Sequence, residues 1–375
     1  MNDHFVYVGT FTPEFTTIEG LPMGRPAEGI SVFRIDGTNG AFTHIQTVSN
    51  LTSPSFVALH PTLPRLYAVE RQRDANTPNE GVVTTFHIPD ESGILELVDR
   101  QGTAGQWPSY VSVHGSGGHL YVTNIEAGNV VALPLDDGGH VGEADTIIQH
   151  QGIGTHPRGD GPRTHCVVPN IDGSEVAVAD IGLNTVTAYS TDATTGELSQ
   201  RAADTLTLSA GSGPRHLAFH PRLPNLYAVN ELNSTLTVIG HDAQGRMAAI
   251  QTMSTVPASF SRRTAASDIL AHPNGRFVYA TNRGHDSIAV FEIDQSSGSV
   301  ELRGYEPSRG RLPRVIATDA GGEFLLVANQ GSGTIVSFRL DQQSGWPHPT
   351  GFAVHTPTPV SLALRNVSSQ CFCRA

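Results

Sequence analysis

Short runs of β-branched and aromatic residues, each bounded by Gly, Asn, Asp or Pro, recur along the whole chain. Segments with apolar residues at the three- and four-residue spacing of an amphipathic helix are nearly absent. Such runs are typical of strands, and the residues that bound them favour turns. The pattern therefore predicts an all-β protein.

One phrase returns at a spacing of about 50 residues, close to the period of propeller blades. It consists of a small or polar residue, a short apolar stretch that often ends in His-Pro, a turn, and Leu-Tyr-Ala-Val with a polar end. The clearest copies are residues 55–70 and 215–231. Weaker copies begin at Ser109, His165, Ser267 and Arg314. Each copy continues into a third and a fourth apolar run, so each unit is predicted to be a four-stranded blade.

The two ends of the chain carry complementary halves of this repeat. Residues 6–10 form a second-strand phrase with no first strand before it, and residues 358–364 form a first-strand phrase with no second strand after it. Together with six complete copies, the halves predict seven blades in a ring that is closed by pairing of the two chain ends. An open solenoid would not explain the two halves. We therefore expect a single propeller over residues 1–365 and a tail over residues 366–375.

Charge and cysteine content narrow the classes of function. Lys and Arg number 23 against 35 Asp and Glu, and the net charge of -12 argues against a nucleic acid or a membrane surface as the main partner. No apolar run approaches the roughly 18 residues of a membrane span. Cys166, Cys371 and Cys373 cannot form the framework of a disulfide-rich secreted protein. We expect a cytoplasmic protein, with the last two cysteines in a frayed tail rather than a metal site.

Equivalent positions at one end of the blades should form rings around the central channel. The ring at the start of the first strands is predicted to contain Ser55, Ser109, His165, Arg215, Ser267, Arg314 and a residue near Pro359. The ring at the end of the second strands is predicted to contain Phe11, Arg71, Ile125, Asp180, Glu231, Arg283 and Gln330. Purely structural positions keep their chemistry from copy to copy, as Tyr67, Tyr121, Tyr227 and Tyr279 do. The ring positions instead vary in chemistry.

The charged ring members are concentrated in neighbouring blades, which predicts a site to one side of the channel axis. The simplest alternative is a set of channel-lining ion pairs with bound water. Four other histidines occupy one repeated place before a turn, and we expect each of them to bond to a neighbouring backbone group. They are His60, His114, His220 and His272. The chain contains no nucleophile elbow, phosphate-binding loop, His-Glu-x-x-His or Cys-x-x-Cys motif.

Several phrases carry a resemblance to a known family. The most specific lie in residues 213–221 and 227–234, with further matches in 179–184 and 267–275 and at the opening Tyr-Val-Gly-Thr of residues 7–10. On these residues, and over almost its full length, the chain resembles the lactonase family of seven-bladed propellers. That family includes bacterial 6-phosphogluconolactonases of the propeller type and a fungal 3-carboxy-cis,cis-muconate lactonizing enzyme. By motif, the resemblance implies a catalytic set of His165, Arg215, Glu231 and Arg283.

Six further residues around this set are expected to bind the substrate. They are Arg71, Arg163, Asp180, Asn230, Asp268 and Arg314. Arg163 stands in Pro-Arg-Thr-His where many bacterial members read Pro-His-x-His, and this difference predicts a change in substrate. The loop from Phe11 to Gly29 is expected to be a lid or pocket wall, and it joins residues 159–163 as a candidate for specificity.

A lactone hydrolase must activate water, stabilise the charge that develops on the carbonyl oxygen, and protonate the leaving alkoxide. We expect His165 or Glu231 to act as the general base, and Arg215 and Arg283 to hold the oxyanion and the anionic group of the substrate. A carboxylate between two arginines is normally ionised, which favours Glu231 as a base over a resting acid.

Other functions use the same residues. The same side chains could catalyse the reaction of a muconate-type cycloisomerase or of a lactonase for another ring. A non-catalytic binding propeller is a third hypothesis. The expected partner is a small lactone. No cofactor or metal is expected, since the predicted set lacks the carboxylate-rich ligands of calcium. A closed ring mildly favours a monomer, because its own blades cover the sheet edges.

Overall fold

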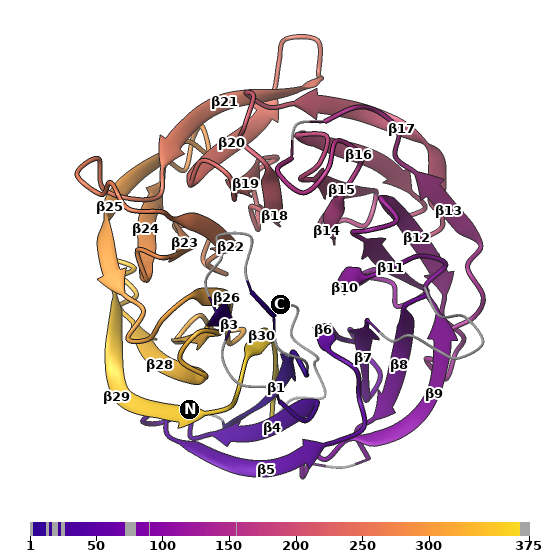
Figure 1. The fold of residues 1–375 in the computed structure, drawn as a ribbon, viewed down its shortest axis with the longest axis vertical. Coiled ribbons are helices and arrows are strands. Elements are labelled where there is room, and N and C mark those ends of the chain that lie inside the picture. Colours follow the sequence, from indigo (N-terminus) through magenta and orange to yellow (C-terminus); the bar gives the residue numbers. More distant parts are fainter. Residues whose placement is uncertain are drawn as a thin grey trace.

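The computed structural model describes residues 3–12, 15–16, 22–23, 27–71, 80–89, 91–154 and 156–367. These residues form seven four-stranded antiparallel sheets, which follow one another around a ring (Figure 1). A short pair of strands, β2 (Phe15–Thr16) and β3 (Pro22–Met23), lies apart from the blades. Helices are absent from the described residues, so no helix in this part of the chain is long and apolar enough to cross a membrane. The predicted all-β seven-bladed propeller is confirmed.

The strands of each blade run in order from the channel outward. The innermost strands are β6 (Pro54–Leu59), β10 (Pro108–Val113), β14 (Thr164–Pro169), β18 (Pro214–Phe219), β22 (Ala265–Ala271), β26 (Pro313–Thr318) and β30 (Pro359–Asn366). The second strands are β7 (Arg65–Glu70), β11 (His119–Asn124), β15 (Glu175–Asp180), β19 (Leu226–Asn230), β23 (Phe277–Arg283), β27 (Phe324–Asn329) and β1 (His4–Thr10). The third strands are β8 (Val82–His87), β12 (Asn129–Pro134), β16 (Thr185–Thr191), β20 (Thr235–His241), β24 (Ser287–Ile293), β28 (Thr334–Leu340) and β4 (Ile30–Ile35). The outer strands are β9 (Glu96–Gly102), β13 (Thr146–Gln149), β17 (Leu198–Thr207), β21 (Met247–Ser254), β25 (Val300–Pro307), β29 (Pro347–His355) and β5 (Phe42–Val48).

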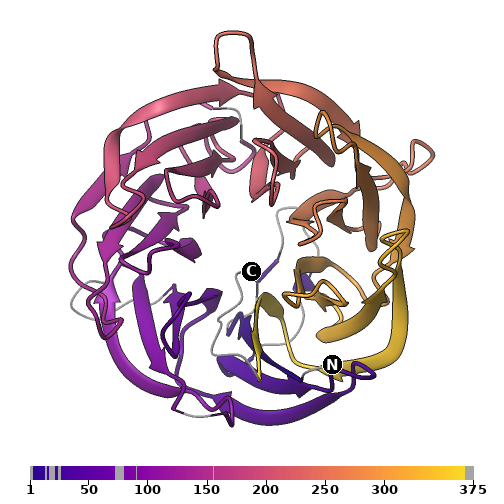
Figure 2. The same cartoon turned by 180° about the vertical axis from the view of Figure 1, so that it is seen from behind.

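The two ends of the chain share one blade, as the half-repeats predict. Strand β30 pairs with β1 in a register that runs from His4 opposite Asn366 to Thr10 opposite Pro359. Seen from behind in Figure 2, the ring is closed by the same pair of strands. Strand β30 ends one residue beyond the predicted limit of the propeller. The rest of the predicted tail, with Cys371 and Cys373, lies outside the described residues.

The core of the protein lies between the blades. Side chains of Tyr67 and Val69 from one blade pack against Val111, Leu120 and Val122 of the next, and all five are at most 1% exposed. Successive side chains on a strand point to opposite faces of the sheet. Because each face of a blade meets a neighbouring blade, both sets are buried, and the second strands consist of nearly continuous apolar runs.

The repeated histidines connect neighbouring blades. His60 Nδ1 accepts a hydrogen bond from Leu63 N at 2.9 Å in its own turn, while Nε2 lies 3.2 Å from the carbonyl oxygen of Gly117 in the next blade. The equivalent bonds from His114, His220 and His272 end on the carbonyls of Gly173, Gly275 and Gly322. The expected bonding to backbone groups is confirmed, and each imidazole joins two adjacent blades.

Candidate active site

A β-bulge occurs near the start of the innermost strand in every blade. In β18, Pro214 pairs with Asn230 and His216 with Val229, so that Arg215 has no partner in the ladder. A bulge of this kind redirects the side chain of the extra residue. The residues at the seven bulges are Ser55, Ser109, His165, Arg215, Ser267, Arg314 and Val360. They are the first predicted ring, with Val360 as the member expected near Pro359.

The serines of this ring connect adjacent inner strands. Ser55 Oγ donates to the carbonyl oxygen of Pro108 at 2.6 Å, and Ser267 Oγ donates to that of Pro313 at 2.6 Å. The short members of the ring therefore stabilise the channel wall. The longer members, His165, Arg215 and Arg314, instead interact with charges from other blades.

The strand register corrects one member of the second ring. Asp180 pairs with Thr164 at the position where Asn230 pairs with Pro214, so Asp180 is equivalent to Asn230 and not to Glu231. The ring member in that blade is Ile181, and the predicted ring was wrong there by one residue. The ring in the structure comprises Phe11, Arg71, Ile125, Ile181, Glu231, Arg283 and Gln330.

Glu231 lies between two arginines from adjacent blades. Its Oε2 atom is 2.9 Å from Arg215 Nε and 3.0 Å from Arg283 Nη2. All three side chains are buried. Burial raises the pKa of Glu231, but the charges of Arg283, Arg215 and Arg314 outweigh burial and hold it at about 2. The carboxylate is therefore ionised at neutral pH.

Two further arginines add positive charge around this carboxylate. Arg71 Cζ lies 4.6 Å from the ring centre of Phe11 and 4.9 Å from that of Trp107, and Arg314 Cζ lies 5.2 Å from Phe11. Burial, with the charges of Arg215 and other arginines, lowers the pKa of Arg71 to about 10. Burial and the charges of Arg215, Arg283 and Arg71 also lower the pKa of Arg314. Arg215, Arg283 and Arg314 thus interact with a single glutamate, while Arg71 interacts with Arg215 and Arg314, and this excess of positive charge favours an anionic ligand.

Every cationic side chain in this region is an arginine. The sequence contains no lysine, so all 23 of its basic residues are arginines. A planar guanidinium group can donate two parallel hydrogen bonds to a carboxylate or a phosphate, which an ammonium group cannot do. The four arginines are therefore suited to bind a carboxylate or a phosphate group of a ligand.

His165 is a buried, neutral imidazole beside this cluster. Its side chain has no hydrogen-bond partner at Nδ1, and its ring centre lies 5.2 Å from that of His216. Burial, followed by the charges of Arg215, His216 and Arg314, holds the pKa of His165 well below its ordinary value. The structure thus brings together the four residues of the predicted catalytic set, with His165 available as a hydrogen-bonding group.

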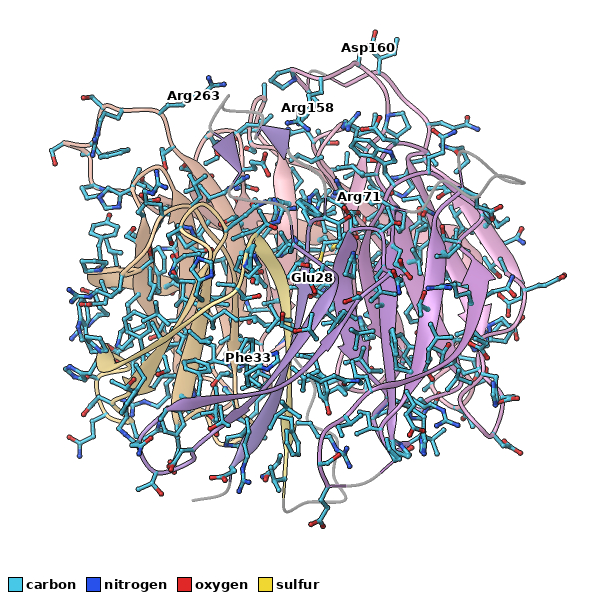
Figure 3. The ribbon with its side chains drawn as sticks, turned by 60° about the horizontal axis from the view of Figure 1, so that its bottom comes forward. Glu28, Phe33, Arg71, Arg158, Asp160 and Arg263 are labelled. Atoms are coloured by element: carbon cyan, nitrogen blue, oxygen red, sulfur yellow. The ribbon has the colours of Figure 1, made fainter. Side chains whose placement is uncertain are left out.

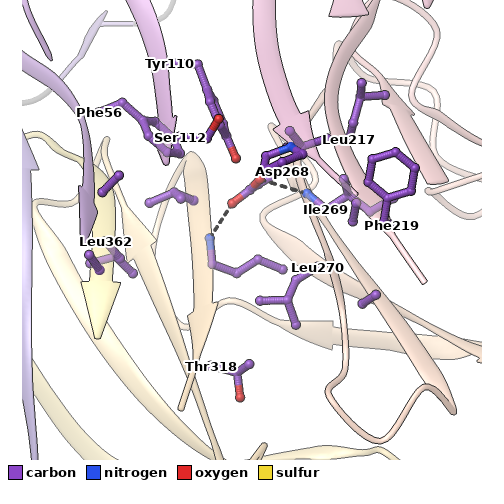
Figure 4. A pocket seen from close by; sticks show the side chains of 18 of the residues that line it. Phe56, Tyr110, Ser112, Leu217, Phe219, Asp268, Ile269, Leu270, Thr318 and Leu362 are labelled. Carbon is purple, nitrogen blue, oxygen red and sulfur yellow. Dashed lines mark hydrogen bonds between the residues drawn. The ribbon is translucent and has the colours of Figure 1, made fainter. Parts of the chain in front are cut away.

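An aromatic layer lies directly below the bulges. Phe56 stacks on Tyr110 with ring centres 3.9 Å apart, and the Tyr110 ring meets His216 edge-on at 5.2 Å. A cavity of about 350 Å³ lies along the channel and is lined by residues that follow the bulges, including Phe56, Tyr110, Leu217 and Asp268 (Figure 4). His216 was not among the predicted site residues, although it follows Arg215 directly.

Three of the predicted substrate-binding residues are engaged in other contacts. Arg163 pairs with Glu126. Asp180 accepts hydrogen bonds from three backbone amides and lies 2.8 Å from His150 Nδ1. Asn230 donates to the hydroxyl groups of Thr235 and Thr237. These contacts stabilise the blades, and a role of the three residues in substrate binding stays a prediction.

The loop before β14 lies on the same face as the arginines. Arg158 and Asp160 lie at the outer surface of this face, with Arg71 below them (Figure 3). Within the same loop, the side chain of His156 is buried and interacts electrostatically with Arg163 and Glu231. The other predicted lid, residues 11–29, falls largely outside the described residues.

The described residues contain no group of three or more His, Cys, Asp or Glu side chains that could hold a metal ion.

Comparisons with known proteins agree with the fold. The family model described as "Lactonase, 7-bladed beta-propeller" matches residues 5–364. A 6-phosphogluconolactonase of Bacillus subtilis is 29% identical over 320 residues, covering 85% of this chain and 86% of that protein. A 6-phosphogluconolactonase of Pectobacterium atrosepticum is 32% identical over 276 residues, covering 72% and 76%. The structure of the periplasmic gluconolactonase of Pseudomonas aeruginosa is 28% identical, with a TM-score of 0.84 and coverage of 97% and 99%. With the match extending over nearly all of its blades, the chain belongs to the lactonase family of seven-bladed β-propellers.

Proposed function

We propose that this protein hydrolyses an anionic sugar lactone, with 6-phosphogluconolactone as the leading candidate. The observation that carries the proposal is the ionised Glu231 held between Arg215 and Arg283, with the charge of Arg314 acting on Glu231 and that of Arg71 acting on Arg215. Relatives named 6-phosphogluconolactonase support the choice of 6-phosphogluconolactone as the substrate. A neutral lactone alone would not require so many cationic groups.

In the proposed reaction, Glu231 activates the attacking water. The carbonyl oxygen of the lactone binds the guanidinium groups of Arg215 and Arg283, and the negative charge that develops on this oxygen is stabilised there. When the two arginines donate hydrogen bonds to the substrate, their interaction with Glu231 weakens. The pKa of Glu231 then rises, and the carboxylate becomes a stronger base. The ion pairs with Arg215 and Arg283 both end on Oε2, so we assign Oε1 to the water.

The proton then returns to the leaving group. Water adds to the carbonyl carbon and gives its proton to Glu231, and collapse of the tetrahedral intermediate breaks the bond to the ring oxygen. Glu231 transfers the proton to that oxygen, and the new carboxylic acid ionises on release. The neutral His165 is assigned a hydrogen bond to the substrate, while Arg71 and Arg314 bind the remote anionic group.

A panel of substrates tests this proposal. The purified full chain is incubated with 6-phosphogluconolactone, with the uncharged glucono-lactone and with a carboxy-muconate, and each reaction is compared with the spontaneous rate. We expect the highest kcat/KM for the phosphorylated lactone. Conversion of the muconate without turnover of any lactone would instead assign a cycloisomerase, and the four arginines would then bind its carboxylates. No turnover of any substrate would favour a binding propeller.

Two further expectations belong to the proposal. The protein is expected to act as a monomer in the cytoplasm, although the related gluconolactonase of Pseudomonas aeruginosa is named periplasmic. Sedimentation of the purified protein and fractionation of cells test these two points separately.

A further inference from the structure

A chain of hydrogen bonds connects Arg215 to a buried carboxylate on the next blade. Arg215 Nη1 lies 3.1 Å from His216 Nε2, and His216 Nδ1 lies 2.6 Å from Asp268 Oδ1. All three residues are at most 6% exposed. We propose that Asp268 is a positioning residue for Arg215, acting through His216, and this inference rests on the proposed role of Arg215 in lactone hydrolysis.

The geometry requires one tautomer of His216. Arg215 can only donate, so His216 Nε2 must accept, and the ring proton must lie on Nδ1, where it is donated to Asp268. Burial, followed by the charge of Arg215, lowers the pKa of His216 to about 4, so the ring is neutral at physiological pH. A neutral ring with a fixed tautomer presents a lone pair to the guanidinium group, and this orients Arg215 with its Nε towards Glu231.

Asp268 is itself fixed by the backbone of two blades. Its Oδ1 atom also accepts from Ile269 N at 2.9 Å, and its Oδ2 atom accepts from Ile316 N at 2.8 Å (Figure 4). Every one of these three partners donates a hydrogen bond. An asparagine at this position would therefore present an NH₂ group to a donor, whichever way its amide is turned.

The two orientations of such an asparagine have different consequences. With the NH₂ group towards His216, the ring must move its proton to Nε2, which then faces Arg215 Nη1 as a second donor. With the NH₂ group towards Ile316 N, the link to the next blade is lost. Both orientations change the hydrogen bonds that fix the His216 ring beside Arg215.

The test compares Asp268→Asn with a matched His-Asp pair elsewhere. In the full chain, Asp145 Oδ2 lies 2.7 Å from His119 Nε2, at a pair outside the proposed site, and Asp145→Asn is the control. For Asp268→Asn we expect kcat for the phosphorylated lactone to fall about 100-fold, the size of effect that misplacement of a positioned group produces, with KM changed less. Asp145→Asn should leave both constants within about twofold of the wild type, since Asp145 is partly exposed and the pair lies outside the proposed site.

Variants of His216 show whether Asp268 acts through this ring. His216→Phe removes the acceptor and should lower kcat by a similar factor, whereas His216→Gln, whose Oε1 can accept from Arg215, should recover part of the rate. Adding Asp268→Asn to His216→Gln should then have little further effect. Equal losses from Asp268→Asn in both backgrounds would overturn the proposal. If Asp268→Asn does not fold, the contrast between Phe and Gln at residue 216 decides the question.

Nitrogen-15 NMR of the imidazoles provides a readout that does not depend on turnover. The wild type should show His216 with its proton on Nδ1, and Asp268→Asn should shift this tautomer. A tautomer and a kcat that are both unchanged in Asp268→Asn would overturn the proposal. Absence of lactone turnover in the wild type would overturn the proposed function alone, because the tautomer would still report the link from Asp268 to His216.

Discussion

Arg215 in β18 and Glu231, directly after the adjacent strand β19, belong to one blade, with Arg215 Nε 2.9 Å from Glu231 Oε2. The bulge in β18 removes Arg215 from the ladder, and Glu231 follows the last residue of β19. A single blade thus supplies a cation and a carboxylate at its inner end, and Arg283 of the next blade joins them. The pair therefore depends on the backbone irregularity as much as on the two side chains.

The pH dependence of the reaction should show a broad plateau. Glu231 has a pKa of about 2, the pKa of His165 is held well below its ordinary value, and Arg215 has a pKa of about 10. For a lactone without a titrating group of its own, we expect kcat/KM to be constant between about pH 5 and pH 9 after correction for spontaneous hydrolysis. An acid limb centred near pH 6.5 would show that an ordinary histidine controls the reaction in the free enzyme.

Removal of Arg71 or Arg314 should affect charged substrates selectively. Arg71→Met or Arg314→Met should lower kcat/KM for the phosphorylated lactone about 10- to 100-fold, as expected for losing a hydrogen bond to a charged group. The value for uncharged glucono-lactone should change by less than about threefold. Arg246→Met provides the control, because Arg246 is an exposed residue paired with Asp242. Equal losses for both lactones would contradict recognition of the anion by these two arginines.

Acid should destabilise the protein through His216. Its pKa is about 4 in the folded protein, below the ordinary value of 6.5, so the unfolded chain takes up the proton first. The associated stability is complete above about pH 6.5 and is lost as the pH falls through about 4, with a total of about 3 kcal/mol. Urea unfolding of wild type and His216→Phe at pH 7 and pH 4 measures this effect. The variant should lose less stability between the two pH values, and parallel losses would contradict the assignment.

A histidine that connects blades should affect stability without affecting the reaction. His272 Nε2 lies 2.9 Å from the carbonyl oxygen of Gly322, and its Nδ1 atom accepts from Asn274 N. His272→Ala leaves these buried backbone groups without a partner, and we expect the free energy of unfolding to fall by about 2 to 4 kcal/mol. His348→Ala, at an exposed position, should change it by less than about 0.5 kcal/mol. A change in KM for His272→Ala would show that this position is not purely structural.

The architecture could be predicted because the sequence repeats it. The Leu-Tyr-Ala-Val phrase occurs in two blades and weaker forms of it recur in the others, and the half-repeats at residues 6–10 and 358–364 indicate how the ring closes. The repeat also predicted the order around the ring of the blades that carry His165, Arg215, Glu231 and Arg283. The bulges were not predicted, because they depend on how the strands pair.

Two features of the site show where the sequence was insufficient. Asp180 was assigned to the second ring from the repeat alignment, whereas the strand register gives that place to the apolar Ile181. The contact between His216 and Asp268 was missed because it joins two blades one residue beyond the predicted ring. Phe56 and Tyr110 occupy the equivalent position in two other blades. The variation in residue type at this position was the feature of the sequence that could have indicated a second layer of site residues.

The kinetics of Glu231→Gln test the central claim most directly. The substitution keeps the shape of the side chain and removes its ability to take a proton from water, so kcat for the phosphorylated lactone should fall by about 10²- to 10⁴-fold. Circular dichroism of the variant should retain the β-sheet spectrum of the wild type. A folded Glu231→Gln protein that keeps kcat within about threefold of the wild type would contradict the assignment of Glu231 as the base.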